Sequence, residues 1–186
     1  MNSADNFSGL ETRAEIFRIA RLSAPVFDSL GRITFEGDPA SELHRHVWRD
    51  AVFLPCLVPA IYASYSAARK GFRELVAVDH KLNARLAGPL AKNSRATGRQ
   101  IAMSAKAPVG ETALERYLPA VECGESPGHM AVVFTARAAA FHQPLPLVVA
   151  AIVFLEFRAS SIGDLWPAIE DCLLQIPLAE NGLRAA

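Results

Sequence analysis

The most apolar part of the chain is the stretch 128–157, in which almost every position suits the interior of a helix. A break at Gln143-Pro144 divides it, so the pattern predicts two helices, over 128–142 and 144–160. Helices this apolar must be buried on most sides, and we expect them to form the centre of a helical bundle. The longest apolar run, Leu145–Leu155, is too short to cross a membrane, because a span needs about 20 residues.

Amphipathic segments surround this central pair. Thr12, with Glu15 as its capping-box partner, begins a helix that Pro25 ends. Asp38-Pro39 begins another, which Pro55 and Pro59 interrupt. Its apolar stripe has members about four residues apart: Leu43, Val47, Ala51 and Leu54. Further helices are predicted at 60–69, 72–86, 90–105, 111–118 (ended by Pro119) and 164–175 (capped by Asp164).

The remaining segments are predicted as connections. Residues 25–38 and 119–127 are rich in proline and glycine. Arg32–Glu36 alternates like a strand, but a single strand without a partner does not form a sheet. The prediction is therefore an all-α, single-domain bundle, orthogonal or up-down, of about eight or nine helices. We expect the domain to span residues 11–177, between a flexible N-terminus at 1–10 and a flexible tail at 178–186.

Composition narrows the functional classes. The 186 residues are 51% hydrophobic and 20% charged, and 19 basic residues cancel 19 acidic ones. A chain without net charge has no overall electrostatic reason to bind nucleic acid or an anionic membrane. So little charge for so much apolar content predicts that a partner covers part of the surface. Three widely spaced cysteines and a polar N-terminus without a signal-peptide pattern predict a reducing, cytoplasmic setting.

Candidate chemistry is sparse. Cys123 and His129 flank a proline- and glycine-containing loop that could bring them together, but a closed zinc site needs four ligands. The pattern lacks a nucleophile elbow and a phosphate-binding glycine loop. We therefore predict that the protein is not an enzyme and holds no resident cofactor.

The spacing predicts a basic stripe along one helix, formed by Lys92, Arg95, Arg99 and Lys106. It is either a solvated helix face or a docking surface for an acidic partner. Within it, Gly98 costs about 1 kcal/mol relative to alanine. A residue this small would let another backbone approach closely.

Two stretches, Val78–Ala102 and Gly128–Phe157, resemble the family of the urease accessory protein UreF. Asp79 and spaced leucines are followed by Ser94-x-x-x-Gly98-Arg99, and His129 leads a Val-Val-Phe helix. Ile19–Pro25 is similar to the family's opening Leu-x-x-Leu-Ser-Ser-Pro segment. The chain departs from the family in lacking the Gly-Phe-x-Tyr-Ser segment after Pro25, the Arg-Glu-x-Arg cluster before Ser94 and the Pro-Leu-Gly-Gln segment after Ser161.

The resemblance implies an all-α, often dimeric scaffold that joins a second accessory protein and a GTPase on apo-urease. Such a scaffold supports nickel delivery and regulates GTP hydrolysis without chemistry of its own. The positions carried over are Ser94, Gly98, Arg99 and His129, with roles in orienting the central helix, packing and partner contact. With the basic stripe, the predicted partner-binding residues are Lys92, Ser94, Arg95, Gly98 and Arg99. His129 and Cys123 would touch nickel in passage, since imidazole and thiolate both suit that ion.

Two other classes remain open from the residues. A helical ligand-binding transcriptional regulator predicts a closed apolar pocket and a basic helix that reads DNA. A small helical enzyme predicts a cleft that holds a buried pair of strongly perturbed ionisable groups.

Overall fold

The computed structural model describes residues 10–30, 33–108, 110, 112–157 and 166–174, and this part of the chain is built from helices and connections without strands. The α-helices are α1 (Leu10–Ser23), α2 (Glu42–Trp48), α3 (Val58–Ala68), α4 (Phe72–Arg85), α5 (Gly88–Ser104), α6 (Thr112–Cys123), α7 (Met130–Ala140), α8 (Leu145–Phe157) and α9 (Trp166–Leu174). A 3-10 turn, η2 (Phe27–Ser29), follows α1, and a π-helical segment, η3 (Arg49–Leu57), joins α2 to α3. These are nine α-helical segments in eight helices, because α2, η3 and α3 are continuous. The all-α prediction is confirmed.

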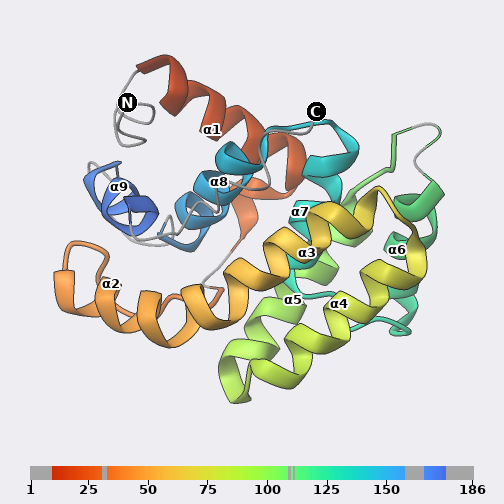
Figure 1. Cartoon of the computed structure of the whole chain (residues 1–186), viewed down its shortest axis with the longest axis horizontal. Helices are drawn as coiled ribbons and strands as arrows, with labels where there is room; N and C mark the ends of the chain where they lie inside the picture. The colour runs from red at the N-terminus through yellow and green to blue at the C-terminus, as the bar shows by residue number, and fades with distance from the viewer. Residues whose placement is uncertain (1–9, 31–32, 109, 111, 158–165, 175–186) are drawn as a thin grey trace.

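Helix α7 forms the centre of the bundle, as its sequence predicts. Every residue of α7 is buried, and so are residues 148–157 of α8. Helix α7 contacts α1, α3, α4, α5, α6 and α8. In Figure 1, α3 crosses in front of α7, α4 runs beside α3, and α1 lies against α8 at the other side of the molecule. Burying one large aliphatic or aromatic side chain contributes about 1.5–3 kcal/mol to stability. The many buried side chains of α7 and α8 therefore supply much of the driving force for folding.

The prediction that Pro55 and Pro59 break the chain is wrong. One helix runs from Glu42 to Ala68. Pro55 lies inside η3, whose wider π-helical turn relieves the clash between a proline ring and the preceding carbonyl. Pro59 directly follows η3 within the same continuous helix, and its missing N–H costs one backbone hydrogen bond there. By length and composition this helix could cross a membrane; 44% of the relevant window is buried inside the protein, and α3 packs against α4 and α7.

Two further helix boundaries also differ from prediction. Asp38 does not cap a helix; its carboxylate accepts from the backbone N–H of Ala40 in a local turn, and Ser41 caps α2 instead. Pro119 does not end α6, which continues to Cys123. Leu118 and Val121, on either side of the proline, are buried in the core, and this packing offsets the one lost backbone hydrogen bond.

Thr12 does not begin α1, which already includes Leu10 and Glu11, so the predicted capping box is wrong. Two further outcomes follow the prediction. Residues 33–38 form a loop, and α1 ends before Pro25. Several predictions concern residues outside the described part of the chain: the flexible tail at 178–186, the cap at Asp164 and the helix end at 158–160. The same holds for the flexible N-terminus predicted at 1–10, of which only Leu10 is described.

Two charged side chains are buried beside the central helices, and each holds a connection in place. Arg137 of α7 donates to the carbonyl oxygens of Leu22 and Ser23, at the C-terminus of α1, and to that of Lys106, over 2.9–3.0 Å. The carbonyls of Leu22 and Ser23 lie in the last turn of α1, where no later helical N–H can satisfy them, so the guanidinium does so. Burial lowers the pKa of Arg137 to about 10, and the side chain stays charged at neutral pH.

Glu156 of α8 holds the loop before α2. One carboxylate oxygen accepts from the backbone N–H groups of Thr34 and Phe35, at 2.8 and 2.9 Å. The Thr34 hydroxyl in turn accepts from the indole N–H of Trp48, at 3.0 Å. The second oxygen of Glu156 is buried without a hydrogen-bond partner. Burial raises the pKa of this carboxyl from 4.5 to about 7, against the hydrogen bonds from Thr34 and Phe35, which lower it.

Replacing Glu156 with Gln should therefore remove a pH-dependent contribution to stability. Because the pKa is raised in the folded state, the stabilisation from the bound proton is complete below pH 4.5 and is lost as the pH rises through 7. We expect Glu156→Gln to raise the free energy of unfolding by about 3 kcal/mol at pH 8 and to leave it unchanged at pH 4. Urea unfolding followed by circular dichroism measures this, with exposed Glu122→Gln as the control. Equal effects of Glu156→Gln at both pH values would contradict the assignment.

Candidate functional site

The residues singled out by sequence meet where α7 begins. The carboxylate of Asp79, on α4, is buried beneath the loop that leads into α7. One of its oxygens accepts from the backbone N–H of His129, at 2.9 Å. The other accepts from the Tyr117 hydroxyl, the Ser126 hydroxyl and the backbone N–H of Gly128, over 2.6–2.9 Å. A negative charge at this place also complements the positive end of the α7 dipole.

The imidazole of His129 is held on both of its nitrogens. Nε2 lies 3.1 Å from Asn83 Oδ1, and Nδ1 lies 3.1 Å from Ser94 Oγ. Because an amide oxygen can only accept, Nε2 carries the proton and Nδ1 accepts from the Ser94 hydroxyl. The same hydroxyl oxygen accepts from the backbone N–H of Met130, at 3.3 Å. His129 therefore links α4 and α5 to the first turn of α7.

Burial also sets the protonation of this network. It lowers the pKa of His129 from 6.5 to about 4; the charge of Asp79 acts in the opposite direction, and that of Arg95 adds to the lowering. The imidazole is thus neutral at pH 7, and the stability that its neutral form contributes is lost as the pH falls from 6.5 towards 4. Burial, together with the charge of Asp79, raises the pKa of Tyr117 well above its usual value.

Gly98 confirms the prediction of a close backbone approach. A Cβ atom at this position would lie 2.0 Å from the carbonyl oxygen of Gly128 and 2.8 Å from the backbone of His129 and Met130. Gly128 is equally constrained: its φ is +74°, and a Cβ atom would lie 2.3 Å from Val121 Cγ1. Helix α5 can approach the start of α7 this closely because Gly98 lacks a side chain, and the loop before α7 can pack against α6 because Gly128 lacks one.

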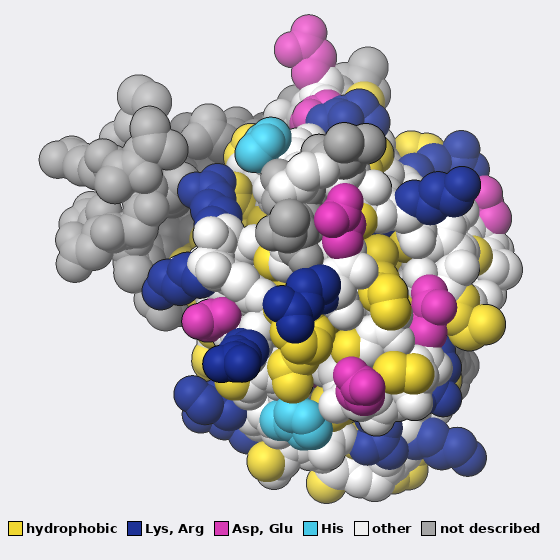
Figure 2. All heavy atoms as spheres, turned by 90° about the vertical axis from the view of Figure 1, so that its right-hand side faces the viewer, with side chains coloured by type: hydrophobic (Ala, Val, Ile, Leu, Met, Phe, Trp, Pro, Cys, Tyr) yellow, Lys and Arg dark blue, Asp and Glu magenta, His cyan; other side chains and the backbone are white. Residues whose placement is uncertain are grey.

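The predicted partner-binding residues separate into two groups. Ser94 and Gly98 are buried and position α7. Lys92 and Arg99 are exposed, and Arg95 is half-buried with its guanidinium donating to Asn83 Oδ1, at 2.7 Å. Lys106 lies beyond the end of α5, so the stripe does not continue along that helix. On the face drawn in Figure 2, basic side chains lie interspersed with acidic and apolar ones.

The predicted nickel contacts do not form a ligand set. His129 is fully buried with both nitrogens occupied, whereas Cys123 is exposed, with its thiol 3.5 Å from the carbonyl oxygen of Ala120. Among the described residues, no group of three or more His, Cys, Asp or Glu side chains could hold a metal ion. The hydrogen bonds around Asp79 and His129 instead fix the position of α7.

The network also bears on the enzyme alternative. It places Tyr117 and His129, whose pKa values are shifted, beside Asp79. All three residues are 0% exposed, and the Tyr117 hydroxyl and the backbone N–H of His129 donate to the Asp79 carboxylate. A substrate would find no cleft at these atoms. Of the described surface hollows, the groove between α3 and α4, of about 200 Å³, is open to solvent, whereas a ligand-binding regulator predicts a closed pocket.

Sequence reasoning did not assign a role to Asn83, Tyr117 or Ser126. Tyr117 carried a signal, since a tyrosine on the apolar face of a short helix needs a hydrogen-bond partner when buried. Asn83 lies four residues after Asp79 and so shares its face of α4. Ser126 lies in a loop and had no such periodic signal.

Comparison with models of known protein families gives a match. The family model described as UreF matches residues 48–158, which is more than half of the chain and includes α4, α5, α7 and the network around Asp79. No protein of curated function and no solved structure matches the chain.

Gly98→Ala should destabilise the protein, because its methyl group would overlap the carbonyl of Gly128 and push α5 away from α7. We expect a loss of about 1–3 kcal/mol in the free energy of unfolding, although alanine is the better helix former. Thermal and urea unfolding measure it. Ala96→Ser, at an exposed position of the same helix, is the control and should change stability by less than about 0.5 kcal/mol. A Gly98→Ala variant as stable as this control would contradict the close approach.

Asp79→Asn tests the hub of the network. An amide presents one acceptor and two donors to a place where four donors converge, so we expect a loss of about 2–4 kcal/mol in unfolding free energy. Tyr117→Phe removes one of the four donors and should cost only about 1 kcal/mol. Hydrogen exchange should show the difference at the first amides of α7. If the two variants lost equal stability, Asp79 would not be the shared acceptor described above.

Proposed function

The chain belongs to the UreF family of urease accessory proteins, and we propose that it is a non-enzymatic scaffold that bridges a second accessory protein and a GTPase on apo-urease. Membership of the family gives it an accessory role in urease maturation. The finer role that we propose is to support nickel delivery and to regulate GTP hydrolysis by holding its partners together, in the cytoplasm and as a homodimer.

The observation that carries the proposal is the family match over the helices that surround the buried start of α7. In that region the polar groups bond to one another and serve to position helices. A protein whose interior polar groups are used in this way acts through its surface, and shape complementarity is what a scaffold requires.

The exposed part of the basic stripe supports a docking role. Lys92 and Arg99 project from α5, and the Arg99 guanidinium passes close to Gly124, beside the exposed Cys123. Between them, Arg95 is held by Asn83, which also accepts from His129. Part of the basic surface is therefore preorganised by the buried network, which lowers the entropic cost of binding an acidic partner.

Nickel is the cargo in this proposal, and the assembled complex delivers it. Coordination by His129 would require its hydrogen bond to Ser94 or to Asn83 to break. We therefore assign His129 a positioning role, and of the two predicted nickel contacts only Cys123 is accessible for transient binding.

The proposal is tested by co-expression with the cognate accessory proteins and urease, in cells that lack their own copy of this chain. We expect a stable complex on size-exclusion chromatography and restored urease activity. The double variant Lys92→Glu, Arg99→Glu should reduce capture of the partner and urease activation about tenfold or more, as expected when about 1.4 kcal/mol of binding is lost.

The matched control is Arg73→Glu, which reverses an exposed charge on α4 and should leave both readouts unchanged. Circular dichroism should show that all three charge reversals leave the fold intact. Wild-type protein that forms no complex and restores no urease activity would overturn the proposed function.

A further inference from the structure

An apolar stripe runs along the outside of the helix Glu42–Ala68. Its six members follow one another at intervals of four residues, and all are exposed: Leu43, Val47, Ala51, Pro55, Pro59 and Ala63. Leu43 is 69% exposed and Val47 is 59% exposed, which places them among the most exposed large apolar side chains of the described residues. The core side of the same helix is formed by other residues, including Trp48, Phe53 and Leu57.

The π-helical segment keeps this stripe on one side of the helix. In an α-helix of 3.6 residues per turn, each step of four residues drifts about 40° around the axis. The wider turn of η3, Arg49–Leu57, opposes that drift in the middle of the stripe. Pro55, which the sequence pattern predicts as a break, thus belongs to a continuous apolar surface.

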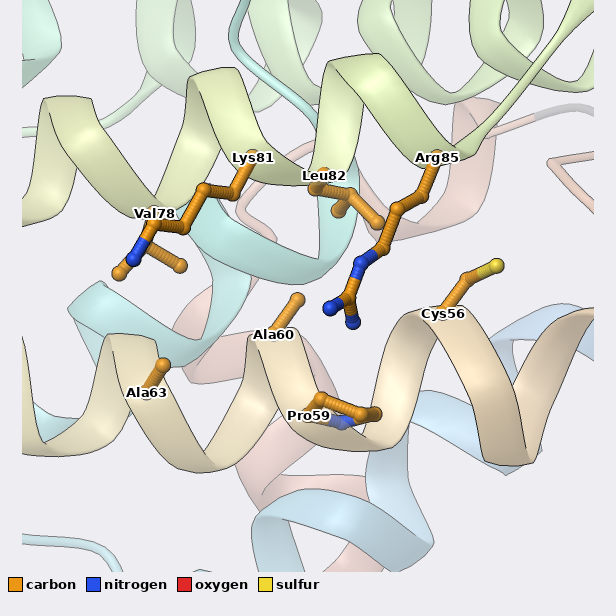
Figure 3. Close-up of a pocket in the computed structure, with 8 residues that line it drawn as sticks. All are labelled: Cys56, Pro59, Ala60, Ala63, Val78, Lys81, Leu82 and Arg85. Atoms are coloured by element: carbon orange, nitrogen blue, oxygen red, sulfur yellow. The ribbon is translucent and has the colours of Figure 1, made fainter.

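A groove borders the C-terminal half of the stripe. Pro59, Ala60 and Ala63 of α3 face Val78 and Leu82 of α4 across it. Figure 3 shows the side chains of α4 directed towards α3, with small side chains on the α3 side. Two cations, Lys81 and Arg85, line the same groove. The groove can therefore bind an apolar side chain that has a carboxylate beside it, because its lining is mostly apolar and two cations lie at its edge.

The N-terminal half of the same stripe has that complementary chemistry. Leu43 has Glu42 beside it, and Val47 is followed by Asp50; the two carboxylate side chains are 75% and 61% exposed. If two copies of the stripe cross in antiparallel orientation about position 53, Leu43 faces Ala63, Val47 faces Pro59 and Ala51 faces Pro55. The larger side chains then meet the smaller ones, and each carboxylate faces the cationic side of the other copy's groove.

We propose that a second copy of this chain binds along this stripe in an isologous dimer, with Leu43 of each copy in the α3–α4 groove of the other. Glu42 pairs with Lys81 of the other copy, and Asp50 with Arg85. This inference rests on the homodimer in the proposed function and assigns its surface. Self-complementarity of one patch is the geometry that a two-fold interface requires.

A lipid bilayer fits this surface less well. The stripe is narrow, it carries carboxylates along its edge, and the opposite side of the helix is engaged with α4 and α7. Within its own chain Asp50 already pairs with Arg49, at 2.8 Å, and Glu42 lies 3.7 Å from His46. Bringing these exposed charged groups into a bilayer would be costly, whereas the groove of the second copy adds a further cation for each carboxylate.

The test is the solution mass of the full chain by size-exclusion chromatography with light scattering. Wild-type protein should have twice the 20.1 kDa chain mass. The variant Leu43→Asp, Val47→Asp should dimerise at least about a hundredfold more weakly, because two apolar contacts are lost in each half of the interface. Glu42→Lys and Lys81→Glu should each weaken the dimer, and their combination should restore it, since the pair is re-formed with exchanged charges.

Met103→Asp is the control, because Met103 lies on α5 with the same 69% exposure as Leu43; this variant should remain dimeric. A dimer that survives Leu43→Asp, Val47→Asp, or charge reversals whose combination restores nothing, would overturn the assigned surface. So would a monomeric wild type, including one that floats with phosphatidylcholine vesicles. If such a monomer still captured the accessory proteins, the proposed function would stand without this interface; a dimer that captured none would retain the interface and reject the function.

Discussion

The structure depends on how its most buried helix begins. Helix α7 is buried on every side, so its first backbone N–H groups lie where water cannot satisfy them. The carboxylate of Asp79 and the hydroxyl of Ser94 supply the missing acceptors, from α4 and α5 respectively. Because these acceptors come from two other helices, satisfying the start of α7 also sets the positions of α4 and α5.

The close approach of α5 to this place follows from the same requirement. Ser94 reaches Met130 and His129 only because Gly98, one turn later on α5, lets the backbone of Gly128 come into contact. Ser94, Gly98 and His129 therefore act as one packing unit. Arg99 and part of Arg95 lie at the surface next to this unit, so α5 contributes both to the buried network and to the proposed docking surface.

Buried charge is used elsewhere in the fold to hold connections. Arg137 joins the end of α1 to the segment after α5, and Glu156 holds the loop before α2. Two buried groups respond to pH in opposite directions: His129 favours folding at higher pH and Glu156 at lower pH. Between about pH 4.5 and 6.5 the contributions of these two groups to stability change in opposite directions.

The sequence by itself determined the all-α class, the central pair around Pro144 and the need for a small residue at Gly98, because burial patterns and glycine costs are local properties that periodicity reveals. It also carried the family resemblance through Asp79, Ser94-x-x-x-Gly98-Arg99 and His129. Only the tertiary structure decided that Pro55 and Pro119 continue their helices, because packing of the neighbouring core residues outweighs the local cost of a proline. Likewise, the acceptors of His129 and the four donors of Asp79 come from segments far apart in the chain, and no spacing within one helix can show which of them meet.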